Sequence, residues 1–192
     1  MFIIAKLIAG RHAKKVQFFY SYNIHKIFQE AIILQEVLNK LHELGINYEL
    51  EEHEAVFTIE AIIKLGLNKR GMIPVNLFLR DANGKRHFLV IHDGEKQTDL
   101  KKLREQIICS RLSFGSEERL YKHLGLTKGS VSPFGLINNI NHDVELIIDS
   151  SIKNQPLLGF HPNINTATVW INYQDFIKFV KSCGNPVKFV DC

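Results

Sequence analysis

A β-hairpin is the sequence feature that most constrains the fold of this chain. Two apolar-rich runs, residues 75–80 and 86–92, flank a polar segment that contains the pair Asn83-Gly84. An Asn-Gly pair between such runs is a strong signal of a tight turn, because both residues accept the positive φ angles that the turn requires. The chain therefore contains antiparallel strand pairing.

Helices and further strands are predicted around this hairpin without a regular alternation of the two. Apolar spacing and capping residues place helices at residues 27–41, 58–65, 99–107, 116–125 and 172–183. Further strands are expected at residues 47–51, 134–137, 144–148, 168–171 and 187–190. With 192 residues, 45% of them hydrophobic, the chain can bury one substantial core. We predict a single α/β domain of the mixed α+β type, with a mixed, mostly antiparallel sheet of about six or seven strands flanked by helices.

The basic residues of the N-terminal segment set it apart from the rest of the chain. Five basic side chains lie within residues 1–29, and all 20 acidic side chains lie after them, so the remainder is close to neutral. We divide the chain into an apolar, basic extension at residues 1–25 and a domain at residues 26–192. Residues 1–22 have the charge of an organelle-targeting peptide, or form an extension packed on the domain. The corresponding locations are organellar or cytoplasmic, and no apolar run approaches the ~18 residues that cross a membrane.

A Gly-x-x-x-Pro segment, Gly129 to Pro133, follows the predicted helix at residues 116–125. Gly129 can take a positive φ and lets a ligand approach the main chain, whereas Pro133 fixes φ and has no N–H. The amides of Ser130, Val131 and Ser132 between them can point the same way and bind a carbonyl oxygen or an oxyanion. An ordinary helix-to-strand turn is the alternative.

A second polar segment lies directly before the strand predicted at residues 168–171. His161 precedes a proline, which favours an extended backbone, and two asparagines and two threonines follow it closely. Other chemistries have little support in the sequence. The nine histidines and three cysteines lack metal-ligand spacing, and neither a serine nucleophile elbow nor a nucleotide-binding loop is present. We therefore expect neither a metal nor a cofactor.

Several motifs in a fixed order resemble one protein family. They are His53 with Val56-Phe57-Thr58 and Glu60, Leu77-Phe78-Leu79-Arg80-Asp81, Asp99-Leu100, Arg111-Leu112-Ser113-Phe114-Gly115, Gly129 through Leu136, Phe160-His161-Pro162 and Asn165-Thr166-Ala167-Thr168. Together they resemble the YbaK/ProX family of aminoacyl-tRNA deacylases, particularly the free-standing prolyl-tRNA editing proteins that hydrolyse alanyl-tRNA(Pro). The resemblance runs from about residue 28 to residue 192, and motifs in order are more specific than any one alone.

The resemblance implies a YbaK-like fold and a trans-editing hydrolase that deacylates mischarged aminoacyl-tRNA, with alanyl-tRNA(Pro) as the leading candidate. The partners it implies are aminoacyl-tRNA, tRNA(Pro) first, and prolyl-tRNA synthetase. The catalytic residues it implies are His161 and Asn76. The substrate-binding residues that it implies are Gly129, Ser130, Val131, Ser132, Pro133, Gly159, Phe160, Asn165 and Thr168.

One position departs from the family pattern. The family usually has Lys-Asn before Leu-Phe-Leu-Arg-Asp, and here the pair is Val75-Asn76. Loss of a charged group from such a site often costs ~2–4 kcal/mol, some 30- to 1000-fold in rate. Lys69 or Arg70, in the preceding loop, is a possible replacement cation. The alternative function is a catalytically weakened or inactive module that binds tRNA acceptor ends or an aminoacyl-tRNA synthetase.

Overall fold

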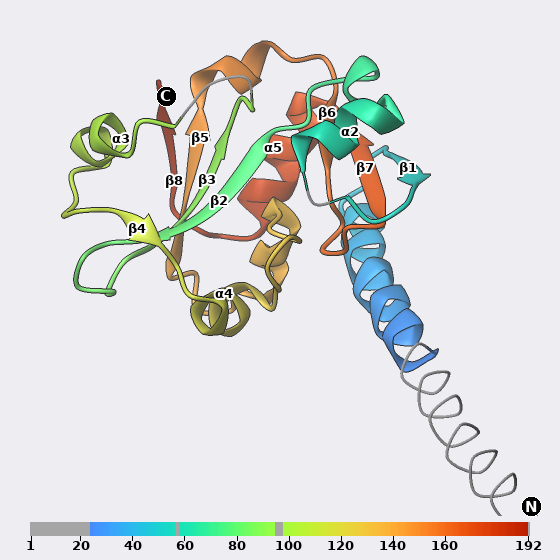
Figure 1. Cartoon of the computed structure of the whole chain (residues 1–192), viewed down its shortest axis with the longest axis horizontal. Helices are drawn as coiled ribbons and strands as arrows, with labels where there is room; N and C mark the ends of the chain where they lie inside the picture. The colour runs from blue at the N-terminus through green and yellow to red at the C-terminus, as the bar shows by residue number, and fades with distance from the viewer. Residues whose placement is uncertain (1–23, 57, 95–97, 192) are drawn as a thin grey trace, which may run out of the picture.

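Eight strands form two sheets in the computed structural model, which describes residues 24–56, 58–94 and 98–191 (Figure 1). One sheet has five strands in the order β4-β2-β3-β5-β8, and the other has three in the order β1-β7-β6. The predicted class, a mixed α/β domain with helices around mixed sheets, is confirmed. The sequence predicts a single sheet, however, and the structure divides its strands between two.

The predicted hairpin forms the centre of the five-stranded sheet. Strands β2 (Val75–Arg80) and β3 (His87–His92) pair antiparallel in register from Val75 opposite His92 to Arg80 opposite His87. The other side of β3 pairs in parallel with β5 (Val144–Asp149), which pairs in parallel with β8 (Val187–Val190). The short β4 (Ser113–Phe114) closes the edge beyond β2. The sheet is therefore mixed, with its hydrophobic central strands buried on both faces.

The three-stranded sheet is entirely antiparallel. Its central strand β7 (Ala167–Ile171) pairs with β1 (Glu49–Glu52) on one side and with β6 (Leu158–Phe160) on the other. An isolated bridge between Met72 and Leu158 connects the chain just before β2 to β6. The two sheets are thus joined near the start of β2, which is the region where the cavity described below lies.

Four of the helices begin at the capping residues that the sequence indicates. They are α2 (Ile59–Leu65), α3 (Leu100–Ile107), α4 (Glu117–Leu124) and α5 (Tyr173–Ser182). The side chains of Thr58, Asp99, Ser116 and Asn172 each accept a main-chain N–H in the first turn. Residues 24–43 form a further helix, whose first turns extend away from the sheets (Figure 1). Among the described residues, no helix is long and apolar enough to cross a membrane.

The strand predicted at residues 134–137 is wrong. Pro133–Asn138 form a 3₁₀ helix, η2, in which the Ser132 hydroxyl accepts the Phe134 N–H at 3.2 Å. The Gly135 N–H closes a tight turn on the Ser132 carbonyl at 3.1 Å. Proline at the first position favours such a turn, because its fixed φ suits a helix and its missing N–H is not needed there. A short apolar run cannot distinguish a buried strand from a buried helical turn.

Four phenylalanines join these elements in the largest hydrophobic core. Phe134 of η2 packs edge-on against Phe160 and Phe179, and Phe160 stacks against Phe176 with ring centroids 4.9 Å apart. All four are at most 1% exposed. Burial of each ring contributes about 2–3 kcal/mol, so η2, β6 and α5 form one rigid unit. The core therefore holds the Gly129–Pro133 loop and the His161 segment in a fixed relative position.

The N-terminal extension proposed from the sequence, including residues 1–22, lies outside the described residues apart from residues 24 and 25. The choice between a targeting peptide and a packed extension, and with it the cellular location, stays a prediction.

Candidate functional site

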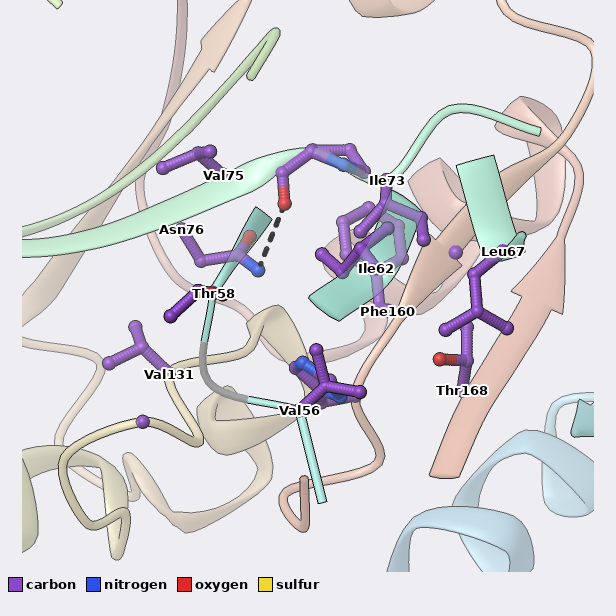
Figure 2. A pocket seen from close by; sticks show the side chains of 14 residues that line it. Val56, Thr58, Ile62, Leu67, Ile73, Val75, Asn76, Val131, Phe160 and Thr168 are labelled. Carbon is purple, nitrogen blue, oxygen red and sulfur yellow. Dashed lines mark hydrogen bonds between the residues drawn. The ribbon is translucent and has the colours of Figure 1, made fainter. Parts of the chain in front are cut away.

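A cavity of about 400 Å³ lies where the start of β2 meets the ends of β6 and β7 (Figure 2). It brings together segments that are far apart in the sequence. Its lining residues are Val56, Thr58, Ile62, Leu67, Ile73, Pro74, Val75, Asn76, Gly129, Val131, Gly159, Phe160, His161 and Thr168. Seven residues that the sequence assigns to the site are among them: Asn76, Gly129, Val131, Gly159, Phe160, His161 and Thr168.

Aliphatic side chains form most of the remaining wall. Val56, Ile62, Leu67 and Ile73 come from α2, the short 3₁₀ helix η1 (Leu67–Lys69) and the adjoining loops, and Figure 2 shows them grouped together. None of these four is among the site residues predicted from the sequence, although Val56 belongs to one of the motifs behind the family resemblance. Aliphatic residues carry no chemical signature, and only tertiary packing separates a cavity wall from a core.

The Gly-x-x-x-Pro loop lies at the cavity through Gly129 and Val131. Gly129 has φ +89°, a conformation that favours glycine, as the sequence predicts. The Ser130 amide and hydroxyl both donate to the Thr127 carbonyl, at 3.1 and 3.0 Å, so this amide is engaged within the loop. Ser132 is fully buried, and its hydroxyl donates to the His161 carbonyl at 2.5 Å. Ser132 therefore ties the loop directly to the histidine segment.

His161 presents a hydrogen-bond acceptor to the cavity. Its Nδ1 lies 3.2 Å from the Ala167 carbonyl. A carbonyl only accepts, so Nδ1 carries the proton of this bond. Burial lowers the pKa of His161, and the nearby His53 lowers it further, while the bond to Ala167 partly opposes the shift. The ring is therefore neutral at pH 7, and no hydrogen bond to its Nε2 lone pair is made by the described residues.

Asn76 contains a buried polar atom without a partner. Its side-chain N–H donates to the Pro74 carbonyl at 3.5 Å, a weak bond drawn in Figure 2. The Asn76 Oδ1 atom is buried, and no hydrogen-bond partner for it exists among the described residues. An unsatisfied buried acceptor costs ~1–3 kcal/mol, and such costs are common at functional sites. The structure thus places an unsatisfied polar atom at a position that the family resemblance assigns to catalysis.

The remaining predicted site residues support the cavity without lining it. Ser130, Ser132 and Pro133 shape the loop, and the Asn165 carbonyl accepts the Val56 N–H at 3.0 Å. Gly159 does line the cavity, and its position leaves no room for a side chain. A Cβ atom there would lie 2.7 Å from Trp170 Cζ3 and 3.0 Å from Thr168 Cγ2.

Neither Lys69 nor Arg70 is part of the cavity lining. The Arg70 guanidinium pairs with the carboxylates of Glu49 and Glu51 and lies over the Trp170 ring at 5.3 Å. Both cations instead line a neighbouring hollow of about 480 Å³, whose lining shares Ile73, Pro74 and Val75 with that of the cavity. At position 75 itself, an uncharged valine contributes to the wall.

The electrostatic character of the cavity is close to neutral. Among the described lining residues, His161 is the one ionisable side chain, and no lysine, arginine, aspartate or glutamate accompanies it. Within the part of the chain that the structure describes, no three His, Cys, Asp or Glu side chains gather as a metal site would require. The cavity can therefore accept a small, largely apolar group, with a neutral histidine and a glycine loop beside it.

This fold and this site define a class of protein: a mixed α/β domain with a compact cavity between two sheets, bounded by a main-chain loop and a histidine. A model of the aminoacyl-tRNA editing domain family matches residues 53–179. The chain belongs to this family. The matched range contains every lining residue of the cavity.

Individual relatives agree with this assignment. The chain is 46% identical over 157 residues to the prolyl-tRNA editing protein ProX of Acetoanaerobium sticklandii, covering 82% of this chain and 96% of that protein. It is 31% identical over 154 residues to the prolyl-tRNA synthetase associated domain-containing protein 1 of Mus musculus, covering 78% and 90%. A solved structure described as a candidate trans-editing enzyme for prolyl tRNA synthetase has a TM-score of 0.64 at 19% identity, covering 83% and 97%. This last likeness supports the fold.

Proposed function

We propose that this protein is a trans-editing hydrolase that removes the amino acid from mischarged aminoacyl-tRNA, with alanyl-tRNA(Pro) as its leading substrate. The observation that carries the proposal is the small aliphatic cavity bounded by His161 and the Gly129–Val131 loop. The family assignment and the 46% identity to a prolyl-tRNA editing protein support it. We further propose the acceptor end of tRNA(Pro) as a partner, and prolyl-tRNA synthetase as a second one.

The size of the cavity supports a substrate with a small side chain. A volume of about 400 Å³ is at the low end for ligand sites, and the aminoacyl group must share it with part of the terminal ribose. An aliphatic wall discriminates weakly between groups that differ by one methylene, but it excludes a ring that overlaps it. The proposed selectivity is that alanine fits and that proline, the correct amino acid, is rejected where its ring overlaps the wall.

The proposed reaction is hydrolysis of the ester between the amino acid and the terminal adenosine. A water molecule donates a hydrogen bond to His161 Nε2 and attacks the ester carbon. Amides of the Gly129–Pro133 loop other than that of Ser130, with Val131 at the cavity, hold the carbonyl oxygen as it becomes negative. The C–O bond to the ribose then breaks, the ribose oxygen takes a proton that originates from the water, and free amino acid and tRNA leave. The neighbouring ribose hydroxyl assists this proton transfer.

A second candidate function has a specific observation in its favour. With Val75 in the wall, the described lining contains no ammonium or guanidinium to stabilise the negative charge of the transition state. A binding module that holds the acceptor end of charged tRNA, or a synthetase, needs no such group. This candidate predicts protection of the ester bond without turnover.

Single-turnover deacylation distinguishes the two functions. We expect the wild-type protein to release alanine from alanyl-tRNA(Pro) faster than spontaneous hydrolysis, and to leave prolyl-tRNA(Pro) intact. His161→Ala should lower the rate by about 10²-fold, because it removes the acceptor that positions the water. A wild-type rate equal to the spontaneous rate, together with binding that slows ester loss, would establish the binding module instead.

A further inference from the structure

A buried hydroxyl in the cavity wall has a hydrogen-bond partner that the sequence does not assign to the site. Thr168 lies on β7, lines the cavity and is 2% exposed. Its Oγ1 lies 2.9 Å from Nε2 of His53, a residue 115 positions earlier in the chain. The Nδ1 atom of the same imidazole lies 2.8 Å from the Glu54 carbonyl. Figure 2 shows the Thr168 side chain among the lining residues, with its oxygen turned toward them.

These contacts determine the direction of both hydrogen bonds. The Glu54 carbonyl can only accept, so His53 Nδ1 carries the proton. In the neutral imidazole, Nε2 is then an acceptor, and the Thr168 hydroxyl must donate its single proton to it. The lone pairs of Thr168 Oγ1 remain for another partner. In the cavity, this hydroxyl can therefore only accept a hydrogen bond.

An acceptor at this position favours a ligand group that donates. The aminoacyl end of a charged tRNA contains one strong donor, the α-ammonium group, which is positively charged at pH 7 for an unperturbed pKa of about 7.7–8.0. No carboxylate is among the described lining residues to balance that charge. Neutral oxygen acceptors are then the groups that can hold it, and hydrogen bonds to a charged donor are among the stronger ones.

We propose that Thr168 binds the α-ammonium group of the aminoacyl substrate, and that His53 is the positioning residue that keeps the Thr168 hydroxyl in its accepting orientation. The inference rests on the proposed function for the identity of the ligand. It assigns two acceptors of the cavity to different tasks, beside the unpartnered Oδ1 of Asn76. Thr168 Oγ1 holds the amino group, and His161 Nε2 remains for the water. The centroids of the His53 and His161 rings lie 6.3 Å apart.

The chain offers a matched control pair outside the cavity. His92 accepts from Thr98 at 2.6 Å through Nε2 and donates to the Asp93 carbonyl at 2.8 Å through Nδ1. The local chemistry equals that of the His53–Thr168 pair, but neither Thr98 nor His92 lines the cavity. Thr98→Val therefore removes the same kind of hydrogen bond without touching the proposed ligand.

The test compares two non-hydrolysable adenosine analogues that bear an alanyl or a lactyl group in amide linkage at the 3′ position. The lactyl analogue has a hydroxyl in place of the ammonium. Calorimetry at pH 7 should show that the wild-type protein binds the alanyl analogue at least about 10-fold more tightly than the lactyl analogue. Thr168→Val should reduce this preference to near unity, and Thr168→Ser should retain most of it. Thr98→Val should leave the preference unchanged.

The role of His53 is tested by a double-mutant cycle on the same preference. His53→Phe should reduce the preference for the alanyl analogue about 3- to 10-fold, because the Thr168 hydroxyl, without its acceptor, can turn its proton toward the ligand. His53→Gln, which offers an acceptor oxygen, should restore part of it. The double variant His53→Phe with Thr168→Val should lose no more than Thr168→Val alone.

The outcomes separate this inference from the proposed function. A wild-type protein that prefers the alanyl analogue but hydrolyses no alanyl-tRNA refutes the catalytic proposal and retains this one. Equal affinity for the two analogues, no binding of the alanyl analogue, or a preference that survives Thr168→Val overturns this inference, whatever the turnover. If Thr168 positioned the water instead, Thr168→Val would slow hydrolysis of alanyl- and lactyl-tRNA equally.

Discussion

Val75 is an uncharged lining residue of the cavity at the position where the family resemblance predicts a lysine. Val75 precedes Asn76 in β2, while the nearby Arg70 is paired to Glu49 and Glu51. A side chain at this position is also close to Gly94, since a Cβ on Gly94 would lie 3.2 Å from Val75 Cγ2. A longer, charged residue would add a cation to a cavity wall that already exists.

We predict that Val75→Lys raises the single-turnover deacylation rate of alanyl-tRNA(Pro) about 30- to 1000-fold, because an ammonium would stabilise the developing oxyanion by ~2–4 kcal/mol. Val75→Met, of similar length without charge, is the control and should change the rate less than about 3-fold. Equal rates for the Lys and Met variants would show that charge at this position does not limit catalysis.

We expect Asn76 to lower the stability of the folded protein while contributing to function. Its buried Oδ1 has no partner among the described residues, so Asn76→Leu should leave the free energy of unfolding unchanged or raise it by about 1 kcal/mol. The same variant should deacylate at least 10-fold more slowly if the amide contacts the substrate. Urea denaturation and single-turnover kinetics measure the two effects. A clear loss of stability would instead assign Asn76 to the structural framework.

At the scale of elements, the Gly129–Pro133 loop is positioned from both sides. The Ser132 hydroxyl ties it to the His161 carbonyl, and Phe134, the second residue of η2, anchors its end in the aromatic core. Because β6 carries Phe160 into the same core, the loop and the histidine cannot move independently. The elements thus provide preorganisation, which the proposed oxyanion contacts require.

The conformation of Gly129 gives a prediction at this scale. Gly129→Ala should destabilise the protein by about 1–2 kcal/mol, since φ +89° disfavours a side chain, and should also slow deacylation about 10-fold by moving the loop. Gly45→Ala is the matched control, because Gly45 has φ +59° and does not line the cavity. Gly45→Ala should show a similar loss of stability in thermal denaturation, and its deacylation rate should be unchanged. A parallel loss of rate in both variants would point to global destabilisation.

At the scale of the whole molecule, a buried histidine on the five-stranded sheet links stability to pH. His87 is 4% exposed, accepts a hydrogen bond from Arg119 at 3.0 Å and lies against His123, with ring centroids 4.0 Å apart. Burial lowers its pKa to about 4, and the charges of His123 and Arg119 act in the same direction, against Asp143 and Asp81. The neutral ring is thus the form that the folded protein accommodates.

The expected consequence is a loss of stability in acid. The unfolded chain binds a proton at His87 near pH 6.5, whereas the folded protein does so only near pH 4, so the contribution is complete above pH 6.5 and declines as the pH falls between these values. Across this window we expect a loss of about 1–3 kcal/mol. Denaturant titrations at several pH values measure it. The His87→Phe variant should lose correspondingly less stability over this pH range. A pH dependence of stability identical to that of the wild-type protein would exclude His87 as the cause.

Local signals in the sequence were sufficient for most of the secondary structure. Thr58, Asp99, Ser116 and Asn172 cap their helices, and Asn83-Gly84 connects β2 to β3, because each of these features depends on hydrogen bonds and φ angles within a few residues. The run at residues 134–137 was predicted wrongly, since burial and length do not distinguish a short strand from a 3₁₀ turn.

The sequence alone determined the hairpin, the helix starts, the glycine loop and, through motifs in order, the family. Only the tertiary structure decided which of these residues share a cavity. His53 and Thr168 meet because β1 and β7 pair, Arg70 is drawn to Glu49 and Glu51 on β1, and four aliphatic residues become a wall. The physical reason is the separation along the chain between the residues that form each feature. Caps and turns are bonded within a few residues, whereas a cavity depends on contacts between segments that chain folding alone brings together.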